Sequence, residues 1–204
     1  MPRSNAVELD TAITEIGSLR WEDSPGAQRR SSSIFAAINV SRLLDELKSG
    51  LDDIADIDKS VEKTTHYKWL LGEDPSKRFQ VWLHEYKPKT HRREGHASVA
   101  HNHRFWLTSL ILRGGFTDTR YVRSHKDDPE SGSIQPIDSR RMRPGDTMVL
   151  APEEIHALSE LRDGTLSLIV QGRPVRSFSE VFENGEVRRY SDLGAKLTDL
   201  QASL

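Results

Sequence analysis

Apolar residues recur at helical spacing in two segments of the N-terminal third of the chain. The first segment spans residues 8–20, and its apolar positions are Leu9, Ile13, Ile16 and Leu19. The second begins after Ser41, a residue type favoured as an N-cap, and its stripe consists of Leu43, Leu44, Leu47, Leu51, Ile54 and Ile57. This spacing predicts two amphipathic helices, the second with a break at Gly50. Residues 22–33, between them, are polar and small, which predicts a linker.

Beyond Asp74-Pro75 the pattern changes from a helical period to a period of two. Short alternating or apolar runs occupy residues 79–86, 107–112, 116–122, 147–150 and 166–170. They are separated by turn dipeptides such as Gly114-Gly115, Asp128-Pro129, Pro144-Gly145 and Asp163-Gly164. Regularly spaced short strands of this kind are typical of an antiparallel barrel or sandwich. The resulting prediction is an N-terminal helix and polar linker over 1–33, a helical segment over 34–76, a β-barrel over 77–190 and a polar tail over 191–204.

Composition limits the classes of partner. With 204 residues and 35% hydrophobic content, the chain is long enough for one well-filled domain with a modest extension. The formal charge of −2 provides no basic field, so neither nucleic acid nor a membrane surface is an expected partner. The first residues lack a continuous apolar stretch, and no run approaches the length of a membrane span, so we expect a cytoplasmic protein. Exposed sheet edges leave a homodimer open.

The candidate chemistry lies in the histidines, because the chain has no cysteine to supply a thiolate ligand. His101 and His103 lie two residues apart between strand-like runs, and an extended backbone projects such side chains to the same side. His156 follows a Gly-Asp turn, a short apolar strand and a Pro-containing bend, so it can return opposite this pair. Three neutral imidazoles leave coordination positions open, which is typical of a catalytic metal site.

These two histidine segments resemble the two sequence motifs of the cupin superfamily. The first motif has a glycine, His-x-His, a glutamate and a second glycine at fixed spacing, and the matching residues here are Gly95, His101, His103 and Gly115. Thr108 stands where that motif has its glutamate. The second motif is matched by Gly145 and His156, with Pro152 displaced by one position. The resemblance implies a mostly β fold, a cupin-type jelly-roll β-barrel with N-terminal α-helices.

A ligand set without the glutamate resembles that of the thiol dioxygenases, the cysteine dioxygenase group. The similarity runs from about His66 to Phe182 and implies Fe(II) held by the three histidines, with Zn, Ni and Mn as alternative metals. It also implies a small-molecule substrate that reacts with O2. Two features differ from that group. Trp69 beside Lys68 replaces the arginine that clamps the amino-acid carboxylate, and of a supporting Ser-His-Tyr set only Ser167 remains. Cysteine is therefore not the expected substrate.

Further site residues follow from the charge of the metal. Three neutral ligands leave its double charge uncompensated, which favours an anionic or bidentate substrate. The candidates to bind that substrate are Tyr67, Lys68, Trp69 and Arg104. The candidate catalytic residues are Thr108, whose short side chain leaves room at the metal, and Arg120 and Tyr121, one of which should face inward. His84 either lines the barrel or caps its rim, and His66 is expected at the surface.

The sequence thus predicts a mononuclear non-haem iron oxygenase of the dioxygenase type, acting on a small polar or anionic metabolite. Two other interpretations stay open. The same barrel holding Zn, Ni or Mn could work without oxygen, as a Lewis-acid isomerase, lyase or hydrolase. Alternatively, the pocket could serve as a small-molecule sensor that binds without turnover. Consumption of O2 separates the first interpretation from the second, and turnover separates both from the third.

Overall fold

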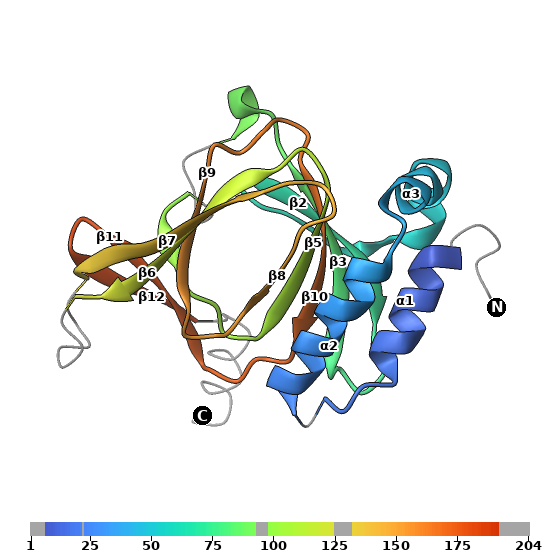
Figure 1. Ribbon diagram of the computed structural model, residues 1–204, viewed down its shortest axis with the longest axis horizontal. Coiled ribbons are helices and arrows are strands. Elements are labelled where there is room, and N and C mark those ends of the chain that lie inside the picture. Colours follow the sequence, from blue (N-terminus) through green and yellow to red (C-terminus); the bar gives the residue numbers. More distant parts are fainter. Residues whose placement is uncertain (1–6, 22, 93–97, 125–131, 192–204) are drawn as a thin grey trace, which may run out of the picture.

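The computed structural model contains two six-stranded antiparallel sheets around a cavity, with three helices outside one sheet (Figure 1). It describes residues 7–21, 23–92, 98–124 and 132–191. The first sheet has the order β1 (Asp56–Glu62), β2 (His66–Glu73), β3 (Phe79–Tyr86), β10 (Leu166–Gly172), β5 (Leu107–Arg113), β8 (Thr147–Leu150). The second has the order β12 (Glu186–Ser191), β11 (Phe178–Glu183), β4 (Ala100–His101), β9 (Ile155–Ser159), β6 (Phe116–Arg123), β7 (Ile134–Met142). This arrangement confirms the expected fold class, a mostly β jelly-roll barrel with N-terminal helices.

Two of the helices were expected from the apolar pattern. These are α1 (Val7–Gly17) and α3 (Val40–Ile54), and non-helical dihedral angles at Gly50 confirm the break in the second. The N-cap of α3 is Asn39 instead of the expected Ser41, because the Asn39 side chain accepts a hydrogen bond from the Arg42 amide at 3.1 Å. Both helices bury their stripes against the outer face of the first sheet, in one core that includes Leu9, Ile16, Leu43, Leu47, Val81, Leu110 and Leu168.

The prediction of a linker over residues 22–33 is wrong, because most of this segment belongs to a third helix, α2 (Ser24–Ala37). Asp23 caps it by accepting a hydrogen bond from the Gly26 amide at 3.1 Å, and Pro25 lies in the first turn, where its missing N–H costs nothing. The buried face of α2 carries polar side chains, including Gln28 and Ser31. Since those positions are polar, the hydrophobic period that identifies an amphipathic helix is weak here.

The strands expected from the period of two are confirmed as β3, β5, β6, β8 and β10. The structure adds β1 and β2 within residues 34–76, where the pattern predicted helix. Ile57, the last residue of the predicted helical stripe, lies on β1 and is 55% exposed. Most residues of β1 and β7 are exposed, so neither strand shows the alternation that marks a half-buried strand.

A tight turn at Gly114-Gly115 carries the chain from β5 in the first sheet to β6 in the second. Both residues have positive φ, and a Cβ on Gly115 would lie 2.3 Å from the carbonyl oxygen of Met142. Only glycine fits there without a shift of the backbone. The turn brings Asp118 of β6 into register with Leu158 of β9, two residues from His156.

Some sequence expectations fall outside the described residues. These are Gly95 of the first motif, the Asp128-Pro129 turn and the tail beyond Ser191. Across the part of the chain that the structure describes, no helix has both the length and the apolar character needed to cross a bilayer.

Candidate metal centre

Strand pairing gathers the three predicted histidines on one wall of the cavity. His101 ends β4 and pairs directly with His156 of β9. His103 follows two residues later, and the intervening Asn102 is fixed by Glu180 of β11. The Asn102 side chain donates to the Glu180 carboxylate at 2.8 Å, while the Glu180 amide donates to Asn102 Oδ1 at 2.7 Å. This double hydrogen bond holds the short segment that carries both His101 and His103.

The outer nitrogen of two imidazoles is bonded to an acceptor. His101 Nδ1 lies 2.8 Å from the Val99 carbonyl oxygen, and His156 Nδ1 lies 2.7 Å from Asp118 Oδ1. In both rings Nδ1 therefore carries the proton, and Nε2 keeps a lone pair toward the cavity. His103 Nε2 lies 3.0 Å from His156 Nε2, and the ligand atoms of the three residues lie within 4.8 Å of one another. Three imidazoles whose nitrogens converge in this way could hold a metal ion.

The acceptor behind His156 is itself held in place. Asp118 is 4% exposed, and its second oxygen accepts a hydrogen bond from Arg120 Nε at 2.6 Å. Burial would raise the pKa of Asp118, but the hydrogen bonds and charges of His156 and Arg120 outweigh it and lower the pKa, so the carboxylate is ionised. Arg120 also bonds Glu154 at 2.9 Å and does not line the cavity. As expected for one of the pair Arg120 and Tyr121, Arg120 shares the face of His156, but it contacts Asp118 and does not line the cavity.

Asp118→Asn tests this support. The amide keeps the size of the side chain but removes the charge that stabilises a metal-bound imidazole, so we expect metal affinity to fall by roughly 10- to 100-fold. Zinc titration against a competing chelator measures the change. Asp45→Asn, on an exposed position of α3, is the matched control and should leave affinity unchanged. Equal affinity for wild type and Asp118→Asn would contradict the role given to Asp118.

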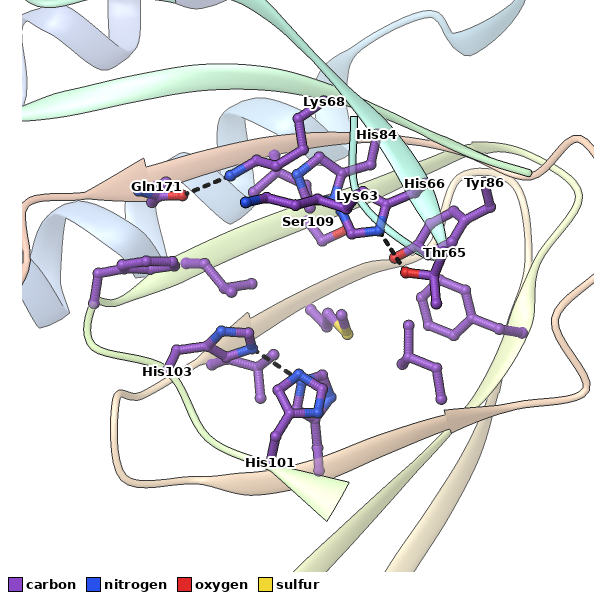
Figure 2. Close-up of a pocket in the computed structure, with 18 of the residues that line it drawn as sticks. Lys63, Thr65, His66, Lys68, His84, Tyr86, His101, His103, Ser109 and Gln171 are labelled. Atoms are coloured by element: carbon purple, nitrogen blue, oxygen red, sulfur yellow. Dashed lines mark hydrogen bonds between the residues drawn. The ribbon is translucent and has the colours of Figure 1, made fainter. Parts of the chain in front are cut away.

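The histidines open onto a cavity of about 380 Å³ inside the barrel. Figure 2 shows His101 and His103 on one side of it, with Lys68, His66 and His84 across from them. None of the described residues that line the cavity is acidic, and much of the wall is apolar. The apolar lining residues include Phe105, Leu107, Phe116, Met148, Leu150, Leu158 and Ile169.

Lys68 is the one predicted substrate-binding residue that lines this cavity. Its Nζ lies 3.4 Å from Gln171 Oε1 and 4.4 Å from the centre of the Trp82 ring. Burial, with a smaller contribution from the charge of Lys63, lowers the pKa of Lys68 to about 8. At neutral pH the cavity therefore contains a cation that no described carboxylate neutralises.

The other three substrate-binding candidates lie elsewhere. Tyr67 and Trp69 alternate with Lys68 on β2, so they project from the opposite face of the sheet, where their rings stack at 5.7 Å. Trp69 packs against the helical core and donates to the Glu85 carboxylate at 3.0 Å. Arg104 offers its carbonyl oxygen to the Val175 amide and does not line the cavity. The placement of these three residues contradicts direct contact with a ligand in this cavity.

Two catalytic candidates also face away from the metal centre. Thr108 alternates with the lining residues Leu107 and Ser109, so it points toward α2, where its hydroxyl lies 2.6 Å from Gln28 Oε1. The expectation that Thr108 leaves room at the metal is therefore wrong. Tyr121 packs with an apolar cluster that contains Ile155, and this cluster lies on the face of the second sheet opposite His156. The hydroxyl of Thr108 has a structural role, which Thr108→Val tests.

Thr108→Val keeps the shape of a fully buried side chain and removes its hydroxyl. We expect a loss of about 1–3 kcal/mol in the free energy of unfolding, because the Gln28 acceptors lose their buried donor. Metal affinity should not change. Thr119→Val on β6, which removes an exposed hydrogen bond to Ser139, is the control with an expected effect below about 0.5 kcal/mol. Denaturant unfolding measures both variants; weaker metal binding at unchanged stability would contradict the outward placement.

Three ring-bearing residues lie on the cavity wall opposite the metal histidines. His66, expected at the surface, lines the cavity, and so does Tyr86, which was not assigned. His84 lines the barrel, one of the two places expected for it. Burial raises the pKa of Tyr86, so its hydroxyl stays protonated. A signal was present for β3, since Trp82, His84 and Tyr86 alternate along one face. For His66 the signal was missing because β2 itself was not predicted.

Comparison with known proteins gives only structural similarity. No protein-family model matches the chain, and no curated protein sequence does. Crystal structures of the DMSP lyases RdDddP and RnDddQII include one similar in shape, with a TM-score of 0.45 and 14% identity over 74% of this chain and 70% of that chain. Ectoine synthase from P. lautus has a TM-score of 0.40 and 17% identity, over 62% of this chain and 77% of its own. KdgF from Halomonas sp. has a TM-score of 0.40 and 13% identity, over 59% of this chain and 95% of its own. These identities do not carry the activity of any of these proteins over to this chain.

Proposed function

We propose that this protein is a mononuclear metalloenzyme of cupin type, an iron-dependent oxygenase that acts on a small anionic metabolite inside the barrel. The observation that supports the proposal most is the convergence of three imidazole nitrogens, within 4.8 Å of one another, at a largely apolar cavity. A ferrous ion held by His101, His103 and His156 would mediate electron transfer from the substrate to O2 and would offer an open position for an anionic substrate group.

The protein's own residues bind and orient the substrate. Lys68, across the cavity from the histidines, donates hydrogen bonds to an anionic group and neutralises its charge (Figure 2). Apolar walls exclude water, which strengthens that interaction and protects reactive species from side reactions. Asp118 and the Val99 carbonyl oxygen fix the tautomers of His156 and His101. Residues on both sides of the cavity thus position the reactants: Lys68 orients the substrate, and the partners of the histidines orient the metal ligands.

A second candidate is an oxygen-independent reaction, in which the metal acts as a Lewis acid and the protein moves a proton. The pKa of Lys68 is lowered to about 8 by burial, so this amine can exchange a proton near neutral pH. Its position across the cavity from the histidines suits removal of a proton from a metal-bound substrate, as in an elimination or isomerisation.

Oxygen uptake distinguishes the two candidates. The iron-loaded protein is incubated with a panel of small carboxylic acids and thiols under air and under nitrogen, with uptake followed by an electrode and products by mass spectrometry. The oxygenase proposal expects substrate-dependent O2 consumption and no product under nitrogen. Product formed equally in both atmospheres would overturn it in favour of the Lewis-acid reaction. His91→Ala, an exposed histidine in the short helix η1 (Lys89–His91), is the control that should behave as wild type.

A further inference from the structure

A row of three polar residues crosses the wall of the first sheet that faces the metal histidines. In the strand register Lys68 of β2 lies opposite His84 of β3, and His84 lies opposite Ser167 of β10. Ser167 shares its face of β10 with Ile169 and Gln171, which line the cavity. Figure 2 shows Lys68 and His84 close together at this wall. The row therefore places an ammonium, an imidazole and a hydroxyl side by side within the barrel.

One member of this row lacks a hydrogen-bond partner within the described structure. His84 Nε2 is buried and unpaired there, whereas the Ser167 hydroxyl interacts with the hydroxyl of Tyr86. A buried polar group without a partner costs about 1–3 kcal/mol, so such groups are uncommon unless a ligand completes them. The hydrogen bond from Lys68 to Gln171 is long, at 3.4 Å. Lys68 and His84, which both line the cavity, are thus available to a ligand, and Ser167 lies beside His84 in the sheet.

The imidazole of His84 is held in a fixed orientation and is neutral. Its ring stacks on that of His66 at 4.5 Å, and His66 Nδ1 is in turn 2.8 Å from the Thr65 hydroxyl. Burial, together with the nearby charges of His66, Lys68 and His103, lowers the pKa of His84 well below its ordinary value. A neutral imidazole offers one lone pair and one N–H, so it can accept a hydrogen bond from a ligand.

The neighbouring charges decide which donor the ligand carries. Lys68 directly neighbours His84 across the strands, and Lys63 also lines the cavity. Two cationic side chains attract a carboxylate and repel an ammonium group, so a hydroxyl is the favoured donor. Residues that face each other across antiparallel strands have Cβ atoms about 5 Å apart, which suits two functional groups on adjacent carbons.

We propose that Lys68, His84 and Ser167 form a subsite for a 2-hydroxy acid, in which Lys68 binds the carboxylate and His84 accepts the hydrogen bond of the hydroxyl. This inference rests on the proposed function of the same cavity and names its substrate class. Ser167 supplies a further hydrogen bond to the same hydroxyl. The subsite selects hydroxy acids over both plain acids and amino acids, because only the hydroxyl satisfies His84 without adding positive charge.

The test compares lactate, propionate and alanine as probes of the zinc-loaded protein, since they share a carboxylate and differ at the adjacent carbon. Calorimetry gives the affinities, and ¹⁵N spectra of the histidine rings report contact with His84. We expect lactate to bind about five- to tenfold more tightly than propionate, because one hydrogen bond to a buried group contributes about that factor in affinity. Alanine should bind most weakly of the three. In His84→Phe the preference for lactate should vanish while the affinity for propionate stays the same.

Three results would overturn the inference: equal binding of lactate and propionate, no binding of either, or a lactate preference that persists in His84→Phe and so belongs to the metal. Ser167→Ala is a second variant with a smaller expected loss of about two- to threefold, should His84→Phe not fold. Failure of the proposed function looks different. In that case the protein does not bind zinc, yet the metal-free protein still prefers lactate and the His84 signals still move.

Discussion

Replacing His101 with alanine is expected to abolish tight metal binding and, with it, turnover. His101 supplies one of three converging ligand atoms, and its ring is 4% exposed and fixed by the Val99 carbonyl oxygen. The remaining two imidazoles are a weak site, so affinity should fall by more than the roughly 100-fold that loss of an outer-sphere partner can cost. Metal content after dialysis against a chelator measures the effect.

The control for His101→Ala is again His91→Ala, which removes an exposed histidine. It should retain wild-type metal content and activity. Circular dichroism before metal addition establishes that both variants are folded. Stoichiometric metal in folded His101→Ala would contradict the ligand assignment, since a site that keeps its affinity without His101 does not depend on it.

Lys68→Met is expected to stabilise the fold while it removes activity. The lowering of the Lys68 pKa from 10.5 to about 8 corresponds to a penalty of about 3 kcal/mol for the buried charge. Loss of the contact with the Trp82 ring offsets about 1 kcal/mol of that gain. The net expectation is a rise of about 2 kcal/mol in the free energy of unfolding, with kcat/KM reduced about 10- to 100-fold through the lost charge-assisted hydrogen bond.

The stability gain of Lys68→Met should depend on pH with a defined sign. Below about pH 8 both the folded and the unfolded wild type carry the Lys68 charge, so the folded state bears the whole penalty. Between pH 8 and 10.5 the unfolded state binds more protons, and wild-type stability rises with pH. The difference between Lys68→Met and wild type should therefore shrink across this range. Lys48→Met, at an exposed position of α3, should show no gain, and destabilisation by Lys68→Met would contradict an uncompensated buried cation.

The metal centre was predictable because its signal is local and strict. His101 and His103 needed only a spacing of two, and the Gly145 to His156 segment needed only a turn, a short strand and a bend. Strand pairing then places His101 directly opposite His156. The fold class was equally accessible, since β3, β5, β6, β8 and β10 all show either alternation or a short apolar run bounded by turns.

The residues around the metal were not predictable in the same way. Which side of a strand faces the cavity depends on register, and a shift of one residue exchanges the two faces. Thr108 was placed on the wrong face for this reason, and the choice between Arg120 and Tyr121 stayed open until the pairing of β6 with β9 was known. Tyr67 and Trp69 lie on the face of β2 that Lys68 does not share. Asp118 gave no signal at all, because its contact with His156 arises from the pairing of β6 with β9.

The two sheets contribute different functional groups to the cavity. His101, His156 and Asp118 lie on strands of the second sheet. Lys68 and His84 lie on strands of the first sheet, across the cavity from His101 and His103 (Figure 2). A substrate that reaches across the cavity would contact both. The helices pack on the outer face of the first sheet, the sheet that carries Lys68, and they do not enter the cavity (Figure 1). This arrangement lets the metal site and the polar wall be altered independently.

The most direct test of the metal centre is a crystal structure of the zinc-loaded protein with data collected on both sides of the zinc absorption edge. We expect one strong anomalous peak at the cavity wall, with His101, His103 and His156 each contributing Nε2 at about 2.0–2.1 Å. A peak at another position, or one bound by only one of the three histidines, would contradict the central claim. The same map would show which coordination positions remain for substrate.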